Sequence, residues 1–160
     1  MITTRVYREN VDMQVQIATE LASLNFIYPD FNDWLRNKVF AQLDTDERKV
    51  FVIQQNSKIL GILILKDTLA EKKICTLRVS PQYSKRGIGS ELMELALREL
   101  RTARPVITVS EEHNADFQHI LKKYGFMLYS SYANYYRRNA IEYSYNGTIE
   151  PNEKFLHRVS

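Results

Sequence analysis

Two continuous apolar runs near the middle of the chain restrict its fold more than any other feature. They cover residues 50–53 and 59–65, with the short polar stretch 55–58 between them. A polar connection of this length predicts a β-hairpin. Apolar residues occupy both alternating positions of each run, so both faces of each strand must be covered. The sequence therefore predicts a sheet with other elements packed on both faces.

Helical and strand patterns surround this hairpin. Asn10 and Asp30, both favoured helix N-caps, each precede an apolar stripe at helical spacing. Further helices are expected over 87–101 and from Asn114 to Gly125, a favoured C-terminal stop. The remaining strands are expected at residues 3–8, 73–80, 105–109, 126–133 and 139–145. The order β-α-α-β-β-β-α-β-α-β-β predicts an α+β fold, a mixed central β-sheet with helices on both faces.

Length and composition fit one domain. The chain has 160 residues, and we expect a domain over 1–146 and a C-terminal tail over 147–160. No apolar run is long enough to cross a bilayer, so no membrane partner is expected. The start of the sequence has no apolar h-region, so we expect no secretory signal. The single cysteine, Cys75, excludes an internal disulfide, which fits a cytoplasmic location.

The net charge of +3 and the pI of about 8.9 make the chain mildly basic. Such a balance is consistent with a polyanionic ligand, and the alternative is an ordinary solvated surface that leans positive. The basic residues form no stripe along the sequence, so nucleic acid is not expected as a partner. His119 and His157 have no neighbours at metal-ligand spacing, so we also expect no metal.

The segment that joins the strand at 73–80 to the next helix has the composition of an anion site. A polar loop contains Gly87 and Gly89, and the helix begins at once. A helix N-terminus offers unpaired N–H groups and a positive dipole, and glycines let an anion approach the backbone. Lys85 and Arg86 add positive charge. We expect a pyrophosphate cradle here, made of Ser84, Lys85, Arg86, Gly87, Ile88, Gly89 and Ser90. Neither a dinucleotide-binding fingerprint nor a P-loop is present.

Two motifs in this frame resemble a known family. Leu77, Val79 and Pro81, followed by a helix that opens with Gly87-Ile88-Gly89, resemble motif A of the GNAT (GCN5-related) N-acetyltransferases. The downstream pattern Asn114, Phe117, Ile120, Gly125 and Phe126 resembles a second motif of the same superfamily. The element order agrees, and the resemblance spans about residues 2–146. It implies the GNAT fold and acetyl transfer from acetyl-CoA to a primary amine of a small molecule, peptide or protein.

The resemblance also implies where the co-substrate lies. Acetyl-CoA would lie between the splayed strands 73–80 and 105–110, with its pantetheine on the backbone of Leu77, Arg78 and Val79. The N–H of Val79 would polarise the thioester carbonyl, an oxyanion contact. Asn114 would either bond the cofactor near its thiol or cap its helix. Ser84 and Lys85 depart from the usual Gln/Arg and Gly, and backbone N–H groups still suffice to bind phosphate.

Both usual proton-transfer positions are altered. Many relatives have a Glu where this chain has Lys73, and a Tyr where it has Leu121. Glu111 and the adjacent Glu112 lie where strand 105–110 ends, and Glu111 is the candidate substitute base. The alternative for each of the two is a solvated loop acid. His113 is a further candidate, and an exposed helix-start histidine is the alternative. Cys75 shares strand parity with Leu77, so we expect both to lie on one face, toward the cofactor; a core thiol is the alternative.

The aromatic residues expected at the acceptor mouth are Tyr28, Trp34, Tyr132, Tyr135 and Tyr136, which alternatively form core or a dimer surface. Relatives often form homodimers. The altered Glu and Tyr positions leave open a low-turnover acyl-CoA-binding or sensing module. A toxin-type acetyltransferase acting on aminoacyl-tRNA is a further alternative.

Overall fold

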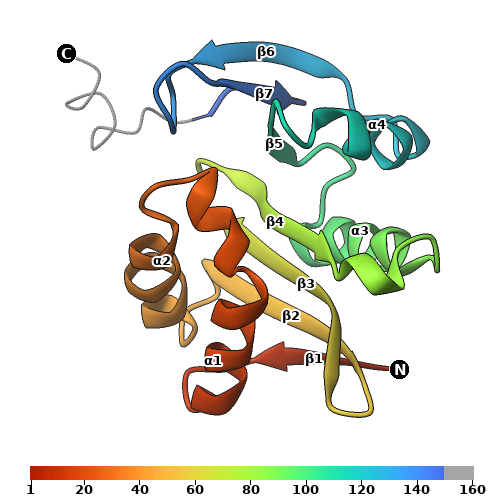
Figure 1. Cartoon of the computed structure of the whole chain (residues 1–160). Coiled ribbons are helices and arrows are strands. Elements are labelled where there is room, and N and C mark those ends of the chain that lie inside the picture. Colours follow the sequence, from red (N-terminus) through yellow and green to blue (C-terminus); the bar gives the residue numbers. More distant parts are fainter. Residues whose placement is uncertain (150–160) are drawn as a thin grey trace.

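The computed structural model of the chain describes residues 1–149, which form one seven-stranded sheet with strand order β1-β2-β3-β4-β5-β7-β6 (Figure 1). Neighbouring strands are antiparallel except β4 and β5, which are parallel. The predicted mixed sheet is therefore confirmed. The strands are β1 Ile2–Val6, β2 Arg48–Gln55, β3 Lys58–Asp67, β4 Lys72–Val79, β5 Val106–Ser110, β6 Leu128–Ala133 and β7 Ile141–Tyr145.

Helices cover both faces of the sheet, as the hairpin pattern requires (Figure 1). Helices α1 and α2 lie on one face, and α3 and α4 lie on the other. The helices are α1 Val11–Glu20, η1 Ala22–Phe26, α2 Phe31–Trp34, η2 Leu35–Val39, η3 Phe40–Gln42, η4 Pro81–Tyr83, α3 Ile88–Leu100 and α4 Asn114–Lys123. The first predicted helix ends earlier than its apolar stripe, because the chain tightens into the 3₁₀ turn η1 after α1.

The hairpin β2–β3 lies between two hydrophobic cores, one on each face of the sheet. Leu63 and Leu65 pack with α3 and α4, whereas Ile62 and Ile64 pack with α1 and α2. All four side chains are at most 1% exposed. Burial of this much apolar surface on both faces is the main favourable contribution to folding.

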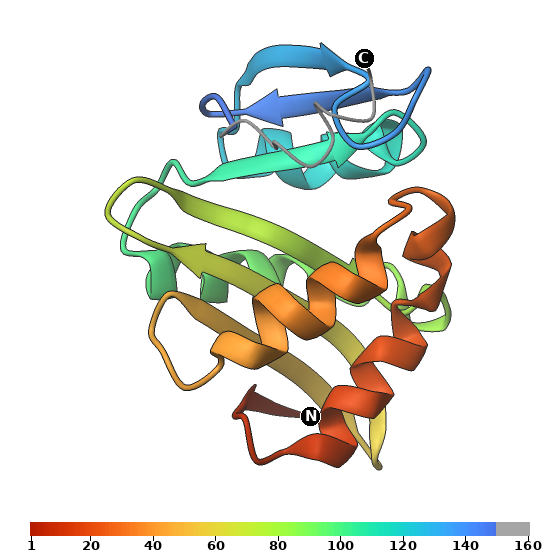
Figure 2. The ribbon, with the colours of Figure 1, turned by 90° about the vertical axis from the view of Figure 1, so that its left-hand side faces the viewer.

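Strands β4 and β5 separate soon after they meet. Their register pairs only Lys73 with Val106 and Ile74 with Ile107 within the described residues, and beyond these pairs the two strands diverge (Figure 2). On its other side β4 stays paired with β3 as far as Val79. The splay predicted from the family resemblance is therefore present in the fold.

A bulge in β4 lies next to this splay. The register with β3 shifts between Ile64 and Leu65, which leaves Cys75 as the extra residue on β4. A bulge reverses the side on which the following residues point. Cys75 consequently packs with the α1–α2 core, whereas Leu77 packs with the α3–α4 core. The expectation that Cys75 shares a face with Leu77 is wrong for this reason.

The C-terminal stop of α4 follows the prediction for Gly125. Gly125 has φ +73°, its N–H bonds the carbonyl of Lys122, and the N–H of Phe126 bonds the carbonyl of Leu121. This pattern is a Schellman motif. At the other end of α4, the N-cap position is His113, so Asn114 is the first helical residue and not the cap.

After β7 the chain stays against the domain for a few residues. Ile149 is 7% exposed, and the hydroxyl of Ser144 donates to the carbonyl of Gly147. Residues 150–160, most of the tail expected over 147–160, lie outside the described part of the chain. No helix within residues 1–149 is long and apolar enough to span a membrane.

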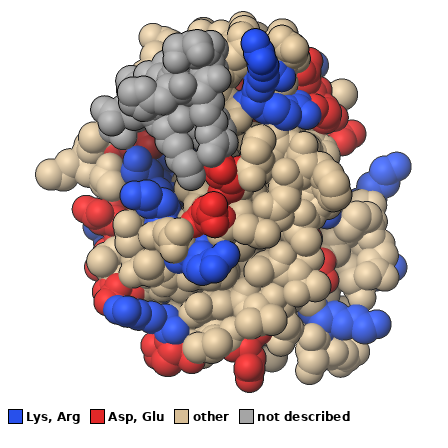
Figure 3. All heavy atoms as spheres, turned by 60° about the vertical axis from the view of Figure 1, so that its left-hand side comes forward, with Lys and Arg blue, Asp and Glu red and all other residues tan. Residues whose placement is uncertain are grey.

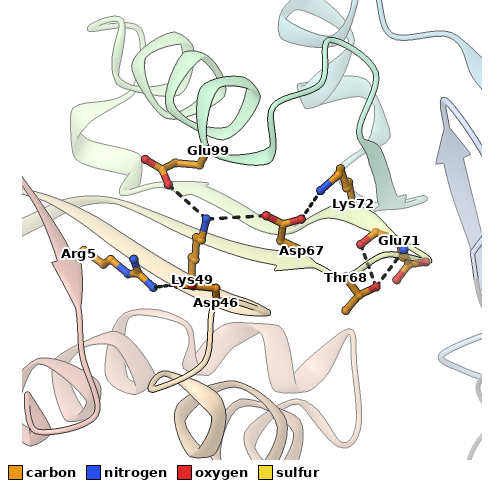
Figure 4. Close-up of polar contacts among 8 residues, drawn as sticks. All are labelled: Arg5, Asp46, Lys49, Asp67, Thr68, Glu71, Lys72 and Glu99. Carbon is orange, nitrogen blue, oxygen red and sulfur yellow. Dashed lines mark hydrogen bonds and ion pairs between the residues drawn. The ribbon is translucent and has the colours of Figure 1, made fainter.

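A group of charged side chains ties β2, β3 and α3 together (Figure 4). Lys49 Nζ lies 3.7 Å from Asp67 and 3.5 Å from Glu99, and its side chain is 12% exposed. Lys72 also pairs with Asp67. Arg5 pairs with Asp46, whose side chain is 90% exposed. The ion pairs of Lys49 are therefore more buried than the ion pair between Arg5 and Asp46.

We expect Lys49→Ala to lower the free energy of unfolding by roughly 1–2 kcal/mol, between the values typical of exposed and buried ion pairs. The reason is that Asp67 and Glu99 both lose a poorly solvated partner. Urea denaturation measures the change. Arg5→Ala is the matched control, with an expected change within about 0.5 kcal/mol. Equal effects of the two variants would contradict the argument from burial.

Candidate active site

The loop between β4 and α3 presents backbone N–H groups to solvent. It runs from Ser80 through η4 to Gly87, which is the N-cap position of α3. Lys85 and Gly87 both have positive φ, +61° and +81°. No side chain within residues 1–149 hydrogen-bonds to the first turn of α3 as a cap. The N–H groups of this turn are therefore available to an anion, together with the positive end of the helix dipole.

The charged residues of this loop lie on the surface, whereas Gly89 faces the protein interior. Lys85 and Arg86 are exposed, and the Arg86 guanidinium lies 5.5 Å from the ring centre of Tyr83. A side chain at Gly89 would instead point inward, since its Cβ would lie 3.4 Å from Ile120 and 3.7 Å from Val79. Gly89 thus lies where α3 meets α4 and β4, at a distance at which a Cβ would make ordinary van der Waals contacts. The predicted cradle residues, 84–90, do lie together.

The splayed part of β4 carries the predicted pantetheine residues. The side chains of Leu77 and Val79 pack against the α3–α4 core, which leaves the strand's free backbone edge toward β5. The Nε of Arg78 is buried without a hydrogen-bond partner in the described residues. Asn114, on the opposite side of the splay, accepts a hydrogen bond of 2.6 Å from the Tyr145 hydroxyl. Gln118 donates to the same carboxamide oxygen, so Asn114 is held in a fixed orientation.

Four of the five predicted acceptor-site aromatics form one cluster. The ring centres of Tyr28 and Tyr136 lie 5.3 Å apart, and those of Tyr135 and Tyr136 lie 4.6 Å apart. The ring of Tyr132 contacts that of Tyr135 in a tilted arrangement, with the ring centres 5.7 Å apart. The segment between η1 and α2 supplies Tyr28, and β6 with the β6–β7 loop supplies the other three. Trp34 is linked to this cluster through Phe31, whose ring contacts both Trp34 and Tyr28.

Sequence reasoning missed the carboxylate at the centre of this cluster. Glu142 of β7 is 4% exposed, and the Tyr28 hydroxyl donates to its Oε1 at 3.1 Å. Burial raises the pKa of Glu142 to about 7, although hydrogen bonds from Tyr28 and Thr108 and the charge of Lys73 oppose the rise. Burial and the same carboxylate raise the pKa of Tyr28, which therefore stays neutral. The one available signal was an acid in the otherwise uncharged strand 141–145.

Lys73 lies on the same side of the sheet. Its Nζ is 3.3 Å from the Tyr136 hydroxyl and 6.0 Å from the centre of that ring. Burial lowers the pKa of Lys73, but Tyr136, Cys75 and Glu71 outweigh burial, so the net pKa lies above the ordinary value. Lys73 is therefore a cation at neutral pH and cannot act as a base.

The other candidate bases are engaged elsewhere. The Glu111 carboxylate accepts a hydrogen bond from the N–H of Ile141 at 3.2 Å, which extends the β5–β7 ladder. Glu112 pairs with Arg137; burial raises the pKa of Glu112, but hydrogen bonds from Arg137 and the backbone lower it below its usual value. His113 lies 3.8 Å from Asp116 on the surface. Arg48 donates to the Cys75 sulfur at 3.3 Å.

The usual acid position is filled by a core residue. Leu121 is 1% exposed and packs in the α3–α4 core. Tyr124, the C-cap residue of α4, donates to the Glu94 carboxylate at 2.9 Å and to the Ser90 carbonyl at 3.3 Å. Its hydroxyl thus links α4 to α3 and faces away from the tyrosine cluster around Glu142.

We expect Tyr124→Phe to change the turnover number by less than about threefold, because general acid catalysis is typically worth about 100- to 10,000-fold and Tyr124 is not placed to supply it. The substitution keeps the ring and removes the two hydrogen bonds to α3. Steady-state release of free CoA thiol measures turnover. A hundredfold drop with unchanged acetyl-CoA affinity would identify Tyr124 as the acid.

Basic and acidic side chains are interspersed on the face drawn in Figure 3. Among residues 1–149 there is no group of three or more His, Cys, Asp or Glu side chains that could hold a metal ion.

Comparisons with known proteins agree with this geometry. The sequence model of the acetyltransferase (GNAT) family matches residues 16–126. No curated protein sequence matches the chain.

Solved structures share the fold at low identity. A protein assigned to the GNAT family from Desulfovibrio desulfuricans has a TM-score of 0.70 at 14% identity, covering 90% of this chain and 97% of its own. The aminoglycoside 6'-N-acetyltransferase from Enterococcus faecium has a TM-score of 0.67 at 14% identity, covering 95% and 99%. The PaiA N-acetyltransferase from Thermoplasma acidophilum, in complex with coenzyme A, has a TM-score of 0.63 at 15% identity, covering 92% and 100%.

The family model matches the chain over both motifs on which the resemblance rests, as far as Phe126. The structural likenesses extend over nearly the whole described domain. The chain belongs to the acetyltransferase (GNAT) family and is an acyltransferase.

Proposed function

We propose that this protein transfers the acetyl group of acetyl-CoA to a primary amine. The observation that supports this most is the splay of β4 from β5, which leads directly to the uncapped N-terminus of α3. A strand edge with free backbone groups suits the amides of pantetheine, and the helix N-terminus suits the pyrophosphate. One continuous path in the fold thus fits both halves of the co-substrate.

We assign each predicted cofactor residue a role along this path. The backbone of Leu77, Arg78 and Val79 bonds the pantetheine, and the Val79 N–H polarises the thioester carbonyl. The residues that receive the pyrophosphate are Ser84, Lys85, Arg86, Gly87, Ile88, Gly89 and Ser90. Asn114, fixed by Tyr145 and Gln118, lies beside the thiol. No metal takes part in this scheme.

The acceptor amine enters on the side of the tyrosine cluster. Tyr28, Tyr132, Tyr135 and Tyr136 offer ring faces, with Trp34 behind them, and such faces attract an ammonium group. Holding the amine next to the thioester is itself worth about 7–11 kcal/mol of the barrier. This part of the mechanism does not depend on the usual Glu and Tyr.

The experiment is an acceptor screen. Protein and acetyl-CoA are incubated with panels of small amines, peptides and proteins, and mass spectrometry detects a gain of one acetyl group. Stoichiometric release of CoA thiol must accompany it. We expect at least one primary amine to be modified repeatedly by each enzyme molecule. Tight acetyl-CoA binding without turnover on any amine would instead favour the acyl-CoA-binding module that Lys73 and Leu121 leave open.

Two further expectations from the sequence stay predictions. The single cysteine, Cys75, is free in the structure, which suits the cytoplasm. Formation of a homodimer, common among relatives, is testable by light scattering.

A further inference from the structure

Glu142 lines a small cavity that nothing in the described chain fills. Tyr28, Ser110, Tyr136 and Arg137 form its walls together with Glu142, and its volume is about 10 Å³. This is close to the ~10–15 Å³ that one water-sized group needs. An ammonium group is of that size, so the cavity can receive the amine end of an acceptor.

The polar groups around the cavity are arranged for a hydrogen-bond donor. Ser110, in register with Glu142 across β5 and β7, is 2% exposed. Its Oγ makes no hydrogen bond of good geometry within the described residues, although it lies close enough to the Tyr28 hydroxyl and the Glu112 carboxylate to oppose the rise that burial causes in the pKa of both. The hydroxyl oxygen and the carboxylate can both accept hydrogen bonds, and a primary ammonium supplies three donors. The Ser110 Oγ can therefore accept a hydrogen bond from the same ammonium as Glu142.

Charged and titratable groups from several elements surround the carboxylate. Tyr28 donates to it, Lys73 of β4 attracts its charge, and Glu112 after β5 opposes that charge. Tyr136 and Arg137 wall the cavity, and Arg137 pairs with Glu112. Burial is the largest influence and outweighs the hydrogen bonds and the charge of Lys73, so that the pKa of Glu142 is raised to about 7, in the range where a general base works best at neutral pH.

We propose that Glu142 is the general base of the acetyl transfer, accepting a proton from an acceptor ammonium held between Tyr28 and Ser110. The inference rests on the proposed function. It assigns the role to β7, because the usual position on β4 carries Lys73, a cation.

The step balances as follows. One N–H proton of the ammonium moves to the Glu142 carboxylate, and the freed lone pair attacks the thioester carbonyl. The C–N bond forms, the C–S bond breaks, and the remaining extra proton on nitrogen goes to the departing thiolate. The products are the amide, free CoA thiol and a protonated Glu142, which returns its proton to solvent before the next turnover.

A first test does not require turnover. In protein labelled with ¹³C at the glutamate carboxyl carbon, the Glu142 signal is the one absent from Glu142→Gln. We expect it to titrate near pH 7 and to titrate at lower pH when tyramine is added, since a bound ammonium favours the carboxylate. The matched probe 4-ethylphenol lacks the amine and should leave the titration unchanged. A Glu142 signal that ignores tyramine would overturn the assignment.

A second test separates a base from a structural residue. Ethylamine is protonated at pH 7, whereas the fluorines of 2,2,2-trifluoroethylamine keep its nitrogen neutral. We expect Glu142→Gln to lower kcat/KM about 100- to 10,000-fold for ethylamine, the range of general base catalysis, and less than tenfold for trifluoroethylamine. Glu142→Asp should restore part of the loss and keep the rise of kcat/KM with pH.

Glu71→Gln is the control, since Glu71 is also buried but pairs with Lys66 outside the cavity. It should leave the pH midpoint of kcat/KM unchanged. Equal losses for both amines with Glu142→Gln would show that Glu142 is structural. If the parent enzyme acetylates no amine at all, the proposed function fails, and the tyramine titration still decides whether Glu142 binds an ammonium.

Discussion

Glu142→Gln is expected to stabilise the folded protein at pH 8 by about 3 kcal/mol while it lowers kcat/KM for protonated amines. In the folded protein the pKa of Glu142 is raised from 4.5 to about 7, mainly by burial. Each pKa unit corresponds to about 1.4 kcal/mol, so ionised Glu142 costs the fold about 3 kcal/mol at pH 8. Glutamine has nearly the same shape and carries no charge, so the variant avoids this cost.

The sign follows from the protons bound in each state. Between about pH 4.5 and 7 the folded state keeps a proton on Glu142 that the unfolded chain has lost. Stability of the parent protein therefore falls as pH rises through this window and levels off above it. The advantage of Glu142→Gln should be near zero at pH 4.5 and reach its full value by pH 8.

Urea denaturation at a series of pH values measures this difference. Glu71→Gln is a control of opposite sign, because it breaks the 3.1 Å ion pair with Lys66 and should destabilise at pH 8. A Glu142→Gln variant less stable than the parent at pH 8 would show that the carboxylate is a favourable structural group. Gain of stability with loss of activity is the behaviour expected when function requires an unfavourable buried charge.

Much of the fold could be predicted because local sequence patterns and the burial of apolar residues indicate the same helices and strands. The hairpin at 50–65 has apolar residues on both faces, and helices cover both faces. The stop at Gly125 follows from its tolerance of positive φ, and the structure has the expected Schellman bonds. These features depend on residues close together in the chain, which a sequence pattern reports directly.

The features that sequence reasoning missed depend on contacts between distant residues. The bulge at Cys75 is a one-residue shift in the pairing of β3 with β4, and no residue type in β4 indicates that shift. It was enough to move Cys75 to the other face of the sheet.

Glu142 was missed for a related reason. Its partner Tyr28 is 114 positions away, and its raised pKa comes from burial that only the assembled sheet provides. Glu111 looked the better candidate because it lies at the end of a strand beside the expected acceptor mouth. In the structure its carboxylate accepts a hydrogen bond from the backbone of β7 instead.

The double variant Lys85→Glu/Arg86→Glu is expected to bind CoA at least a hundredfold more weakly than the parent, a loss of about 2.7 kcal/mol or more. Both side chains are exposed beside the uncapped N-terminus of α3. At roughly 6 Å and an effective dielectric constant of about 20 to 80, one charge pair contributes ~0.7–2.8 kcal/mol. Each substitution replaces an attraction to the pyrophosphate by a repulsion of similar size.

Folding should be little affected by this pair of substitutions. Lys85 has φ +61°, a conformation no harder for Glu than for Lys, and neither residue forms an ion pair within the described chain. Calorimetric titration with CoA measures affinity, and thermal unfolding checks the fold. Lys38→Glu/Lys58→Glu is the matched control, since both lysines are exposed elsewhere and the net charge changes equally.

The effect should also shrink as salt is added, because exposed charges are screened over about 10 Å at 0.1 M ionic strength. The backbone N–H groups of the first turn of α3 remain in the double variant, so some affinity should persist at high salt. An affinity within threefold of the parent at low salt would place the pyrophosphate away from residues 84–90. An equal loss in the Lys38/Lys58 control would instead attribute the effect to net charge and remove the support that Lys85 and Arg86 give to this site.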